Sequence, residues 1–226
     1  MGDLRKNAEK AKALTAIRGH LLALRDEMPN SADDTGVAAQ TIRKILDSAR
    51  DNFTAFGYSG LSMRKVASDA NISVGNLTYH FPTKRKLIDA ILKDALGDFI
   101  AAHLEQIDEV EDEPLDMLLN VVEFYVTNAH SSHKFFYQLW GYAGFDDDSR
   151  ETVRALYKPI GRFVYYLVRA ANPKLNDAEI RRATLQIFSL EEGYKLFIGL
   201  TPEGGGALDN ATEDFRMLAK RLIMDP

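Results

Sequence analysis

The 226-residue chain contains no cysteine and one tryptophan, and it has only 7 prolines and 15 glycines. Without cysteine it can form neither disulfides nor thiolate metal sites. It has no run of about 18 uncharged apolar residues and no signal-like start, so we expect a soluble, cytoplasmic protein that does not enter a membrane. Strand-like alternation of polar and apolar residues is also rare, which predicts an all-α fold.

The motifs of common enzymes are missing as well. Residues 201–207, TPEGGGA, follow no predicted strand and lack the GK[ST] or GxGxxG spacing of a phosphate-binding loop, so we expect a connector there. Residues 57–60, GYSG, do not form the GxSxG nucleophile elbow.

Two side-chain pairs contain residue types that are found in metal and catalytic sites. His130 and His133 have the spacing of a metal pair, but no third ligand is near in the sequence and we expect a loop boundary between them. Glu191 and Glu192 are adjacent, so they point in different directions from a helix, which does not suit general acid–base catalysis. We therefore predict no enzyme activity, no catalytic residues, no metal site and no cofactor.

What the chain does contain is a compact helical corner between Ser62 and Lys84. Ser62 can cap a helix over residues 63–70, and Asn71 tolerates the left-handed backbone that a sharp turn requires. Ser73 can then cap a second helix over residues 74–80.

The second helix has a defined inner face and a defined end. Val74 and Leu77 are expected to point inward with Ile72. Pro82 stops the helix, and Thr83 can cap a longer helix that begins near Lys84. The residues left to face outward are Gly75, Asn76, Thr78 and Tyr79.

Positive charge is concentrated around this corner. Residues 41–86 carry eight Lys or Arg against three Asp, a net charge of +5, whereas residues 87–226 have a net charge of −10. A phosphate-binding face requires such a segregation. Together with the two short helices, it predicts a helix-turn-helix element whose second helix enters the major groove of DNA. The alternative is an ordinary capped corner with a solvated charged face.

Residues 42–92 also resemble the DNA-binding domain of the TetR family of bacterial transcriptional regulators. The resemblance runs without a gap through FTAFGYSG and LSMRKVASDANISVGNLTYHFPTKRKLIDAIL. Asn71 stands where the family often has glycine. Thr78 stands where the family usually has a phosphate-contacting tyrosine, so this contact is either lost or passed to Tyr79. The most specific positions are Phe53, Gly57, Tyr58, residues 72–77, Tyr79, His80, Phe81, Thr83 and Lys84.

The resemblance implies an N-terminal three-helix domain with the helix-turn-helix, followed by a larger C-terminal helical ligand-binding and dimerisation domain. We place the DNA-binding domain at residues 37–83 and the second domain at 84–226, after an extension of residues 1–36. The residues implied to contact DNA are Ser62, Arg64, Ser73, Val74, Gly75, Asn76, Thr78, Tyr79, His80 and Lys84.

The extension contains an apolar seam on a predicted helix over residues 7–27. This helix either docks on the body or on a second subunit, or it belongs to a partly disordered extension. A polar breaker, PNSADDTG, follows from Pro29 to Gly36. The seam consists of Leu14, Ile17, Leu21, Leu24 and Met28.

Hydrophobic periodicity predicts helices through the rest of the chain. In the DNA-binding domain we expect Ile42, Ile45, Leu46, Ala49, Phe53 and Phe56 to face the core opposite Val66, Ile72 and Leu77. The predicted helices cover residues 37–56, 84–107, 115–129, 134–143, 149–171, 177–200 and 208–224.

The second domain has two predicted binding functions. Its middle third is rich in aromatic residues, and such residues either line a small-molecule cavity or simply fill the core. By resemblance the last two helices form the dimer surface, although their apolar stripes can also pack within one subunit. The candidates for the cavity are Tyr125, Tyr137, Trp140 and Tyr166. Those for the dimer surface are Ile180, Thr184, Ile187, Phe215, Leu218 and Leu222.

From the sequence we therefore predict a homodimeric regulator that binds an inverted repeat in double-stranded DNA and is released by an unidentified small-molecule effector. Repression by steric exclusion is the expected mode. The alternatives are a helical protein–protein interaction module that has lost DNA binding, for which Thr78 is the only hint, and an uncharacterised small-molecule enzyme.

Overall fold

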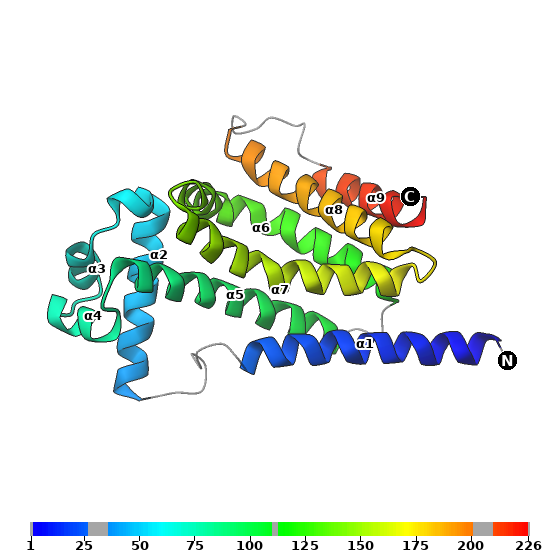
Figure 1. Cartoon of the computed structure of the whole chain (residues 1–226), viewed down its shortest axis with the longest axis horizontal. Helices are drawn as coiled ribbons and strands as arrows, with labels where there is room; N and C mark the ends of the chain where they lie inside the picture. Colours follow the sequence, from blue (N-terminus) through cyan, green and yellow to red (C-terminus); the bar gives the residue numbers. More distant parts are fainter. Residues whose placement is uncertain (1, 27–35, 110–112, 201–209, 226) are drawn as a thin grey trace. The chain divides into compact units, whose positions relative to one another are not determined.

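The computed structural model of the chain describes residues 2–26, 36–109, 113–200 and 210–225, without the side chains of residues 2–11 and 106–109. These described residues form helices and no strand, which confirms the predicted all-α fold (Figure 1). The helices are α1 (Gly2–Asp26), α2 (Val37–Gly60), α3 (Met63–Asp69), α4 (Val74–His80), α5 (Lys84–Glu109), α6 (Pro114–Ala143), α7 (Asp147–Ala171), α8 (Asp177–Ile198) and α9 (Ala211–Met224).

The chain folds into two compact units, which we describe separately. The corner unit comprises Leu24–Ala101 and Lys134–Tyr157, and the α8–α9 unit comprises Met1–Ala23, Ala102–His133 and Lys158–Pro226. Helices α5, α6 and α7 contribute residues to both units. The division into domains at residues 36 and 83 stays a prediction.

The core of the corner unit is built on α2. Its apolar stripe at spacings of three and four faces inward as predicted, except that Ile42 is half-buried and Phe56 is 55% exposed. Phe56 directly precedes Gly57, where the backbone leaves the helical region (φ 63°, ψ −173°), so the register of the stripe ends there. The fully buried side chains at the centre of this core belong to Ile45, Ala49, Phe53, Val66 and Leu77.

Helix α6 differs from the prediction, because residues 115–129 and 134–143 lie on one continuous helix. The serines that suggested a loop bond to their own helix instead. Ser131 and Ser132 donate to the carbonyl oxygen of Asn128 at 3.1 and 2.7 Å, and Nδ1 of His133 lies 2.9 Å from the carbonyl oxygen of His130. The expected loop boundary between the two histidines is therefore wrong. In the part of the chain that is described, no three His, Cys, Asp or Glu residues are grouped as metal ligands.

The N-terminal helix α1 packs into the α8–α9 unit. Ile17 and Leu21 are buried, at 2% and 0% exposure, and the ring of His20 packs edge-on against Tyr166 at 5.8 Å. These contacts favour a docked helix over a disordered extension. The end of the predicted seam, Met28, and residues 29–35 of the polar breaker lie outside the described residues.

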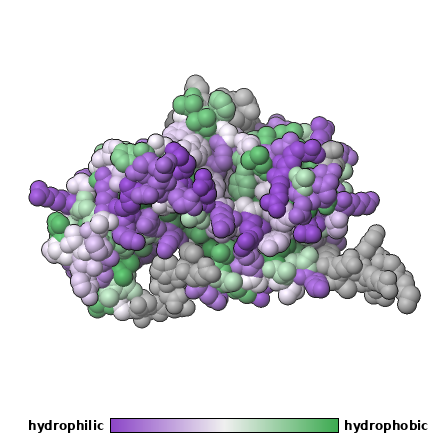
Figure 2. All heavy atoms as spheres, viewed as in Figure 1, coloured by the Kyte–Doolittle hydropathy of each residue, from purple (hydrophilic) through white to green (hydrophobic). Residues whose placement is uncertain are grey.

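Helices α8 and α9 lie side by side (Figure 1). They share a hydrophobic cluster with α6, formed by Val126, Ala129, Tyr194, Ile198 and Ala211 and covered by Phe215. On the face shown in Figure 2, hydrophilic residues predominate and hydrophobic ones reach the surface in small groups. Among the described helices none is both long and apolar enough to cross a membrane.

Candidate nucleic-acid interface

The turn between α3 and α4 has the geometry that the sequence predicts. Asn71 takes the left-handed backbone, with φ of 55°. The amide of Ile72 donates to the carbonyl of Ala67 at 2.9 Å, and the amide of Asn71 donates to that of Ser68 at 3.0 Å, so the last carbonyls of α3 are satisfied. The chain can therefore start a second helix immediately.

Helix α4 is capped by Ser73, whose hydroxyl accepts a hydrogen bond from the amide of Asn76 at 3.1 Å. Its only buried residue is Leu77, at 0% exposure. Val74, which we expected to face inward, is 41% exposed, because this seven-residue helix is anchored by a single side chain. The rest of α4 is consequently available on the surface.

Polar groups brace α3 against α2. The hydroxyl of Ser48 donates to the carbonyl of Val66 at 3.1 Å, and the side-chain amide of Asn52 donates to the Asp69 carboxylate at 2.9 Å. Asn52 and the ammonium of Lys65 together hold the pKa of Asp69 below its ordinary value. The sequence did not indicate this brace, since polar residues such as Ser48 and Asn52 are expected on the solvent face of a helix and here are buried.

The residues predicted to touch DNA lie mostly on the surface. Ser62, Arg64, Gly75 and Asn76 are exposed, and the ring of Tyr79 is 82% exposed. Ser62 occupies the N-cap position of α3, but its hydroxyl makes no capping hydrogen bond, contrary to our expectation.

Thr78 and His80 have more restricted surroundings. The hydroxyl of Thr78 donates to the carbonyls of Val74 and Gly75 at 3.0 and 3.1 Å, so it is turned back onto its own helix. The half-buried ring of His80 packs edge-on against Tyr79 at 5.1 Å. This arrangement favours Tyr79 over Thr78 as the hydroxyl that reaches a phosphate.

The start of α5 is held against the end of α2. Thr83 caps α5 by accepting from the amide of Lys86 at 3.2 Å, as predicted. The ammonium of Lys84 lies 4.5 Å above the ring of Tyr58 and donates to the carbonyl of Ser59 at 3.4 Å. Partial burial lowers the pKa of Lys84, and its ammonium is already in contact with the end of α2.

Arg85 anchors the same turn to the loop between α6 and α7. Its guanidinium donates to both oxygens of Asp146, at 2.7 and 3.2 Å, and Asp146 also accepts from the amide of Ser149 at 2.7 Å. These donors hold the pKa of Asp146 well below its ordinary value. The first turn of α5 is thus fixed within the corner unit.

A third set of ion pairs joins α2 to α5. Asp94 is 8% exposed, and its carboxylate accepts from Arg43 at 2.7 and 3.0 Å and from Arg50 at 2.6 Å. Because Asp94 lies outside residues 41–86, the net charge of that window overstates the charge available to a phosphate. The exposed cations of that window outside these ion pairs and the Lys65–Asp69 pair are Lys44, Arg64 and Lys86.

The four candidate ligand residues are divided between the two units. Tyr125 and Tyr166 belong to the α8–α9 unit, where Tyr125 is buried and Tyr166 is 38% exposed. Tyr137 and Trp140 belong to the corner unit, with ring centres 5.9 Å apart, and the Trp140 indole donates to the hydroxyl of Tyr157 at 3.3 Å. Their role in ligand binding stays a prediction.

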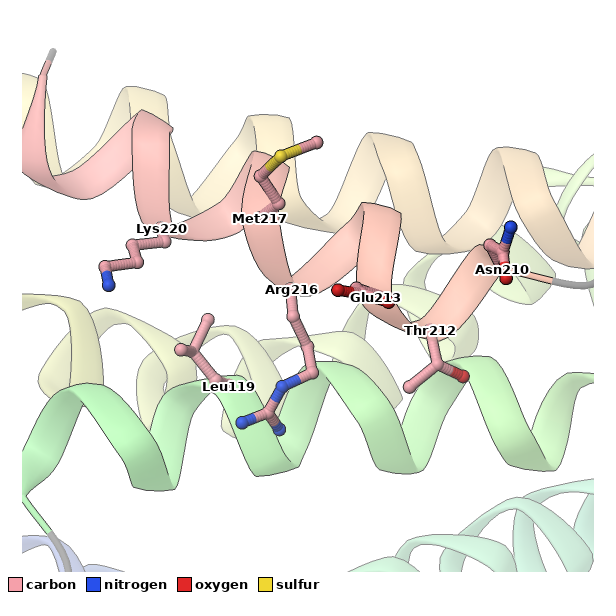
Figure 3. Close-up of a pocket in the computed structure, with 7 residues that line it drawn as sticks. All are labelled: Leu119, Asn210, Thr212, Glu213, Arg216, Met217 and Lys220. Atoms are coloured by element: carbon pink, nitrogen blue, oxygen red, sulfur yellow. The ribbon is translucent and has the colours of Figure 1, made fainter.

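Two surface hollows are described, and neither includes those aromatic residues. One lies between α6 and α9, where Arg216 reaches across and donates to Asn120 and Glu123 at 3.0 and 2.8 Å (Figure 3). Its guanidinium is therefore already paired. This hollow is lined by Leu119, Asn210, Thr212, Glu213, Arg216, Met217 and Lys220. The other, in the corner unit, is lined by Lys44, Asp47, Ser48, Asp51, Asn52, Asp69, Ala70 and Asn71.

The predicted dimer residues divide into inner and outer positions. Ile180 and Ile187 are only 1% and 2% exposed, so they pack inside their own subunit and are not available to a partner. Phe215 packs on Tyr194 at 5.2 Å, whereas Leu218 is 37% exposed. Thr184 and Leu222 are half-buried. The exposed apolar side chains on these two helices and just after α8 are Leu185, Leu196, Phe197, Leu200, Met217, Leu218 and Met224.

The chain has a braced helix-turn-helix with an exposed second helix, followed by a larger set of helices. This combination is typical of helix-turn-helix regulators. Residues 45–91 match the family model described as bacterial regulatory proteins, tetR family. The matched segment includes α3, α4 and most of α2. Over residues 45–91 the chain is thus similar to the TetR family of bacterial transcriptional regulators.

Relatives with curated names match part of the chain. The chain is 37% identical over 59 residues to the transcriptional regulator RutR of Escherichia coli K12, a match that covers 26% of this chain and 28% of RutR. It is 32% identical over 77 residues to the transcriptional repressor KstR2 of Rhodococcus jostii RHA1, covering 34% of this chain and 38% of KstR2. The similarity thus spans well under half of the relatives' own lengths.

Solved structures share the fold over a larger part of the chain. GusR of Salmonella enterica has a TM-score of 0.67 at 18% identity, covering 84% of this chain and 98% of GusR. A transcriptional regulator of Saccharomonospora viridis in complex with choline has a TM-score of 0.64 at 16% identity, covering 80% of this chain and 94% of that protein. At these identities the likeness establishes the fold alone.

Proposed function

We propose that the chain is a homodimeric repressor that binds an inverted repeat in double-stranded DNA through α4 and is released by a small-molecule effector. Two-fold symmetry of the protein imposes two-fold symmetry on the DNA site. Effector binding favours a conformer in which the two corners no longer match successive major grooves.

The observation that carries this proposal is the exposed, braced corner. Helix α4 is fixed by Leu77, by the Ser73 cap and by the left-handed Asn71, while Asn76 and Tyr79 remain exposed. A rigid helix with a free polar face is what base recognition in the major groove requires. In this proposal Asn76 and its neighbours on α4 read base edges, and Ser62, Tyr79, His80 and the start of α5 at Lys84 contact phosphates.

The dimer is proposed to form through the outer faces of α8 and α9. A pair of neighbouring helices with exposed apolar residues can form a four-helix bundle with a second copy. The named relatives support the other parts: KstR2 is a repressor, and the Saccharomonospora regulator was solved with a small molecule, choline. We expect a Leu185→Glu, Phe197→Glu double variant to be monomeric by sedimentation and to bind operator DNA weakly.

The test of the function is selection of bound sequences from a random DNA pool, repeated with cell extract. We expect a palindromic site to be enriched and to be released by extract. Its affinity should fall steeply with salt concentration, because cations on the protein displace counterions from phosphates. No enrichment in either selection would contradict the proposal.

The main alternative is a helical interaction module that has lost DNA binding. Its support is Thr78, whose hydroxyl is committed to its own helix. A Thr78→Tyr variant discriminates the two functions. If the wild type does not bind the DNA pool and this variant does, the site has been lost by substitution. If both bind, Tyr79 carries the contact and the regulator is supported.

A further inference from the structure

Helix α8 carries charged side chains that are buried in the α8–α9 unit. Glu191 and Lys195, one helical turn apart, are each 2% exposed, and the ammonium of Lys195 donates to the carboxylate of Glu192 at 2.9 Å. Neither carboxylate oxygen of Glu191 has a hydrogen-bond partner among the residues that are described, and the same holds for Oε2 of Glu192. Three buried acceptor atoms therefore lack donors within that part of the chain.

Aromatic rings adjoin this group. The ammonium of Lys195 lies 5.2 Å from the centre of the Tyr125 ring on α6. That ring is 6.1 Å from His103 on α5, and His103 packs edge-on against Phe163 on α7 at 5.2 Å. The charged group on α8 thus adjoins Tyr125, which belongs to a ring cluster from α5, α6 and α7 of the same unit.

Such an arrangement lowers the stability of the folded chain. A buried carboxylate without donors loses its hydration and gains no compensating hydrogen bond. Burial accordingly raises the pKa of Glu191 well above its ordinary value, although Lys195 lowers it in part. Buried acids of this kind are concentrated at binding and catalytic sites, where a ligand can provide the hydrogen-bond donors that the protein lacks.

We infer that Glu191, together with Glu192, binds an organic cation that carries N–H donors, namely an ammonium or guanidinium compound. The inference rests on the proposed function, in which this helical region takes the effector. When a cation binds, Glu191 gives up its proton, and two carboxylates against one Lys195 ammonium then leave a net charge of −1. A primary ammonium brings one positive charge and three donors, which matches the three unsatisfied oxygens. An anion or a purely apolar ligand would leave them without donors.

The experiment measures binding of n-butylamine and n-butylguanidine to the full chain by calorimetry and by thermal unfolding, with butyrate as the anionic comparison. The variants are Glu191→Gln and the matched control Glu105→Gln, which changes an exposed acid on α5 in the same unit. We expect saturable binding of the two cations to the wild type and to the control. In Glu191→Gln the affinity should fall by about tenfold or more, the effect of losing one charge-assisted hydrogen bond.

Three results would overturn the inference: no saturable binding of either cation, equal affinity for wild type and Glu191→Gln, or binding of butyrate in their place. The same preparations are tested for binding to the selected DNA site without any probe. Retained DNA binding with no cation binding rejects the cation site and leaves the regulator intact, whereas loss of DNA binding by the wild type rejects the proposed function itself. Glu192→Gln, with a side chain 21% exposed, repeats the test should Glu191→Gln not fold.

Discussion

Replacing Asp94 by alanine should destabilise the corner unit by about 2–3 kcal/mol. The carboxylate accepts three hydrogen bonds from the guanidinium groups of Arg43 and Arg50, and its side chain is 5% exposed. Removing one partner of a fully buried pair costs about 3–5 kcal/mol. Here the cost is lower, because the two arginine side chains are 36% and 30% exposed and keep Asp47 and Asp98 as partners.

Urea unfolding followed by circular dichroism measures this difference. For a slope near 2 kcal/mol per molar, the midpoint should fall by roughly 1 M. The matched control is Asp98→Ala, whose side chain is 60% exposed and pairs with Arg50 alone, and which should cost less than about 1 kcal/mol. If Asp94→Ala lies within about 0.5 kcal/mol of the wild type, the network does not hold α2 to α5 and the argument from burial is wrong.

Three further changes test other parts of the structure. Gly57→Ala should cost about 1–3 kcal/mol, since the left-handed backbone there disfavours any side chain and a methyl group would collide with Gln138; a midpoint equal to the wild type would contradict this. Glu191→Gln should be more stable than the wild type without ligand by about 1–3 kcal/mol near pH 8. Burial raises the pKa of this carboxyl, so the folded state holds a proton that the unfolded state releases above about pH 4.5. The stability of the wild type therefore falls as the pH rises. The difference in stability between Glu191→Gln and the wild type, absent near pH 4, should widen with pH when unfolding is measured over a pH series. Tyr79→Ala should weaken binding to all DNA alike, whereas Asn76→Ala should change the preferred site; equal effects on specific and random DNA in competition assays would contradict that division.

Much of the corner could be predicted from the sequence, because its determinants are local. The Ser73 cap, the left-handed Asn71 and the Thr83 cap depend on residues within three or four positions of one another. The boundaries of α4 were predicted to the residue for the same reason. The prediction for Val74 was wrong because the sequence offers two apolar residues, Val74 and Leu77, for the inner face of this short helix. Only the packing shows that Leu77 is the one that is buried.

Polar residues misled the prediction where a helix satisfies them internally. Ser131 and Ser132 suggested a loop, yet their hydroxyls bond to the carbonyl of Asn128 and leave α6 continuous. Likewise, the apolar stripe of α8 predicted a buried face but not its partner. Ile180 and Ile187 are covered by their own subunit. Hydrophobic periodicity shows that a helix face is buried, but not whether the same subunit or a partner covers it.

The sequence by itself determined the all-helical class, the helix-turn-helix and its likeness to the TetR family over residues 45–91, since caps, breakers and apolar periods act over a few residues. Only the tertiary structure decided which charges are free and which are paired. Arg43, Arg50 and Arg85 seemed to belong to a basic face, but Asp94 and Asp146, distant in the sequence, fold against them. It likewise buried Glu191 with no hydrogen bond to its carboxylate within the described chain. Electrostatic pairing depends on distance in space, and spacing along the chain does not encode that distance.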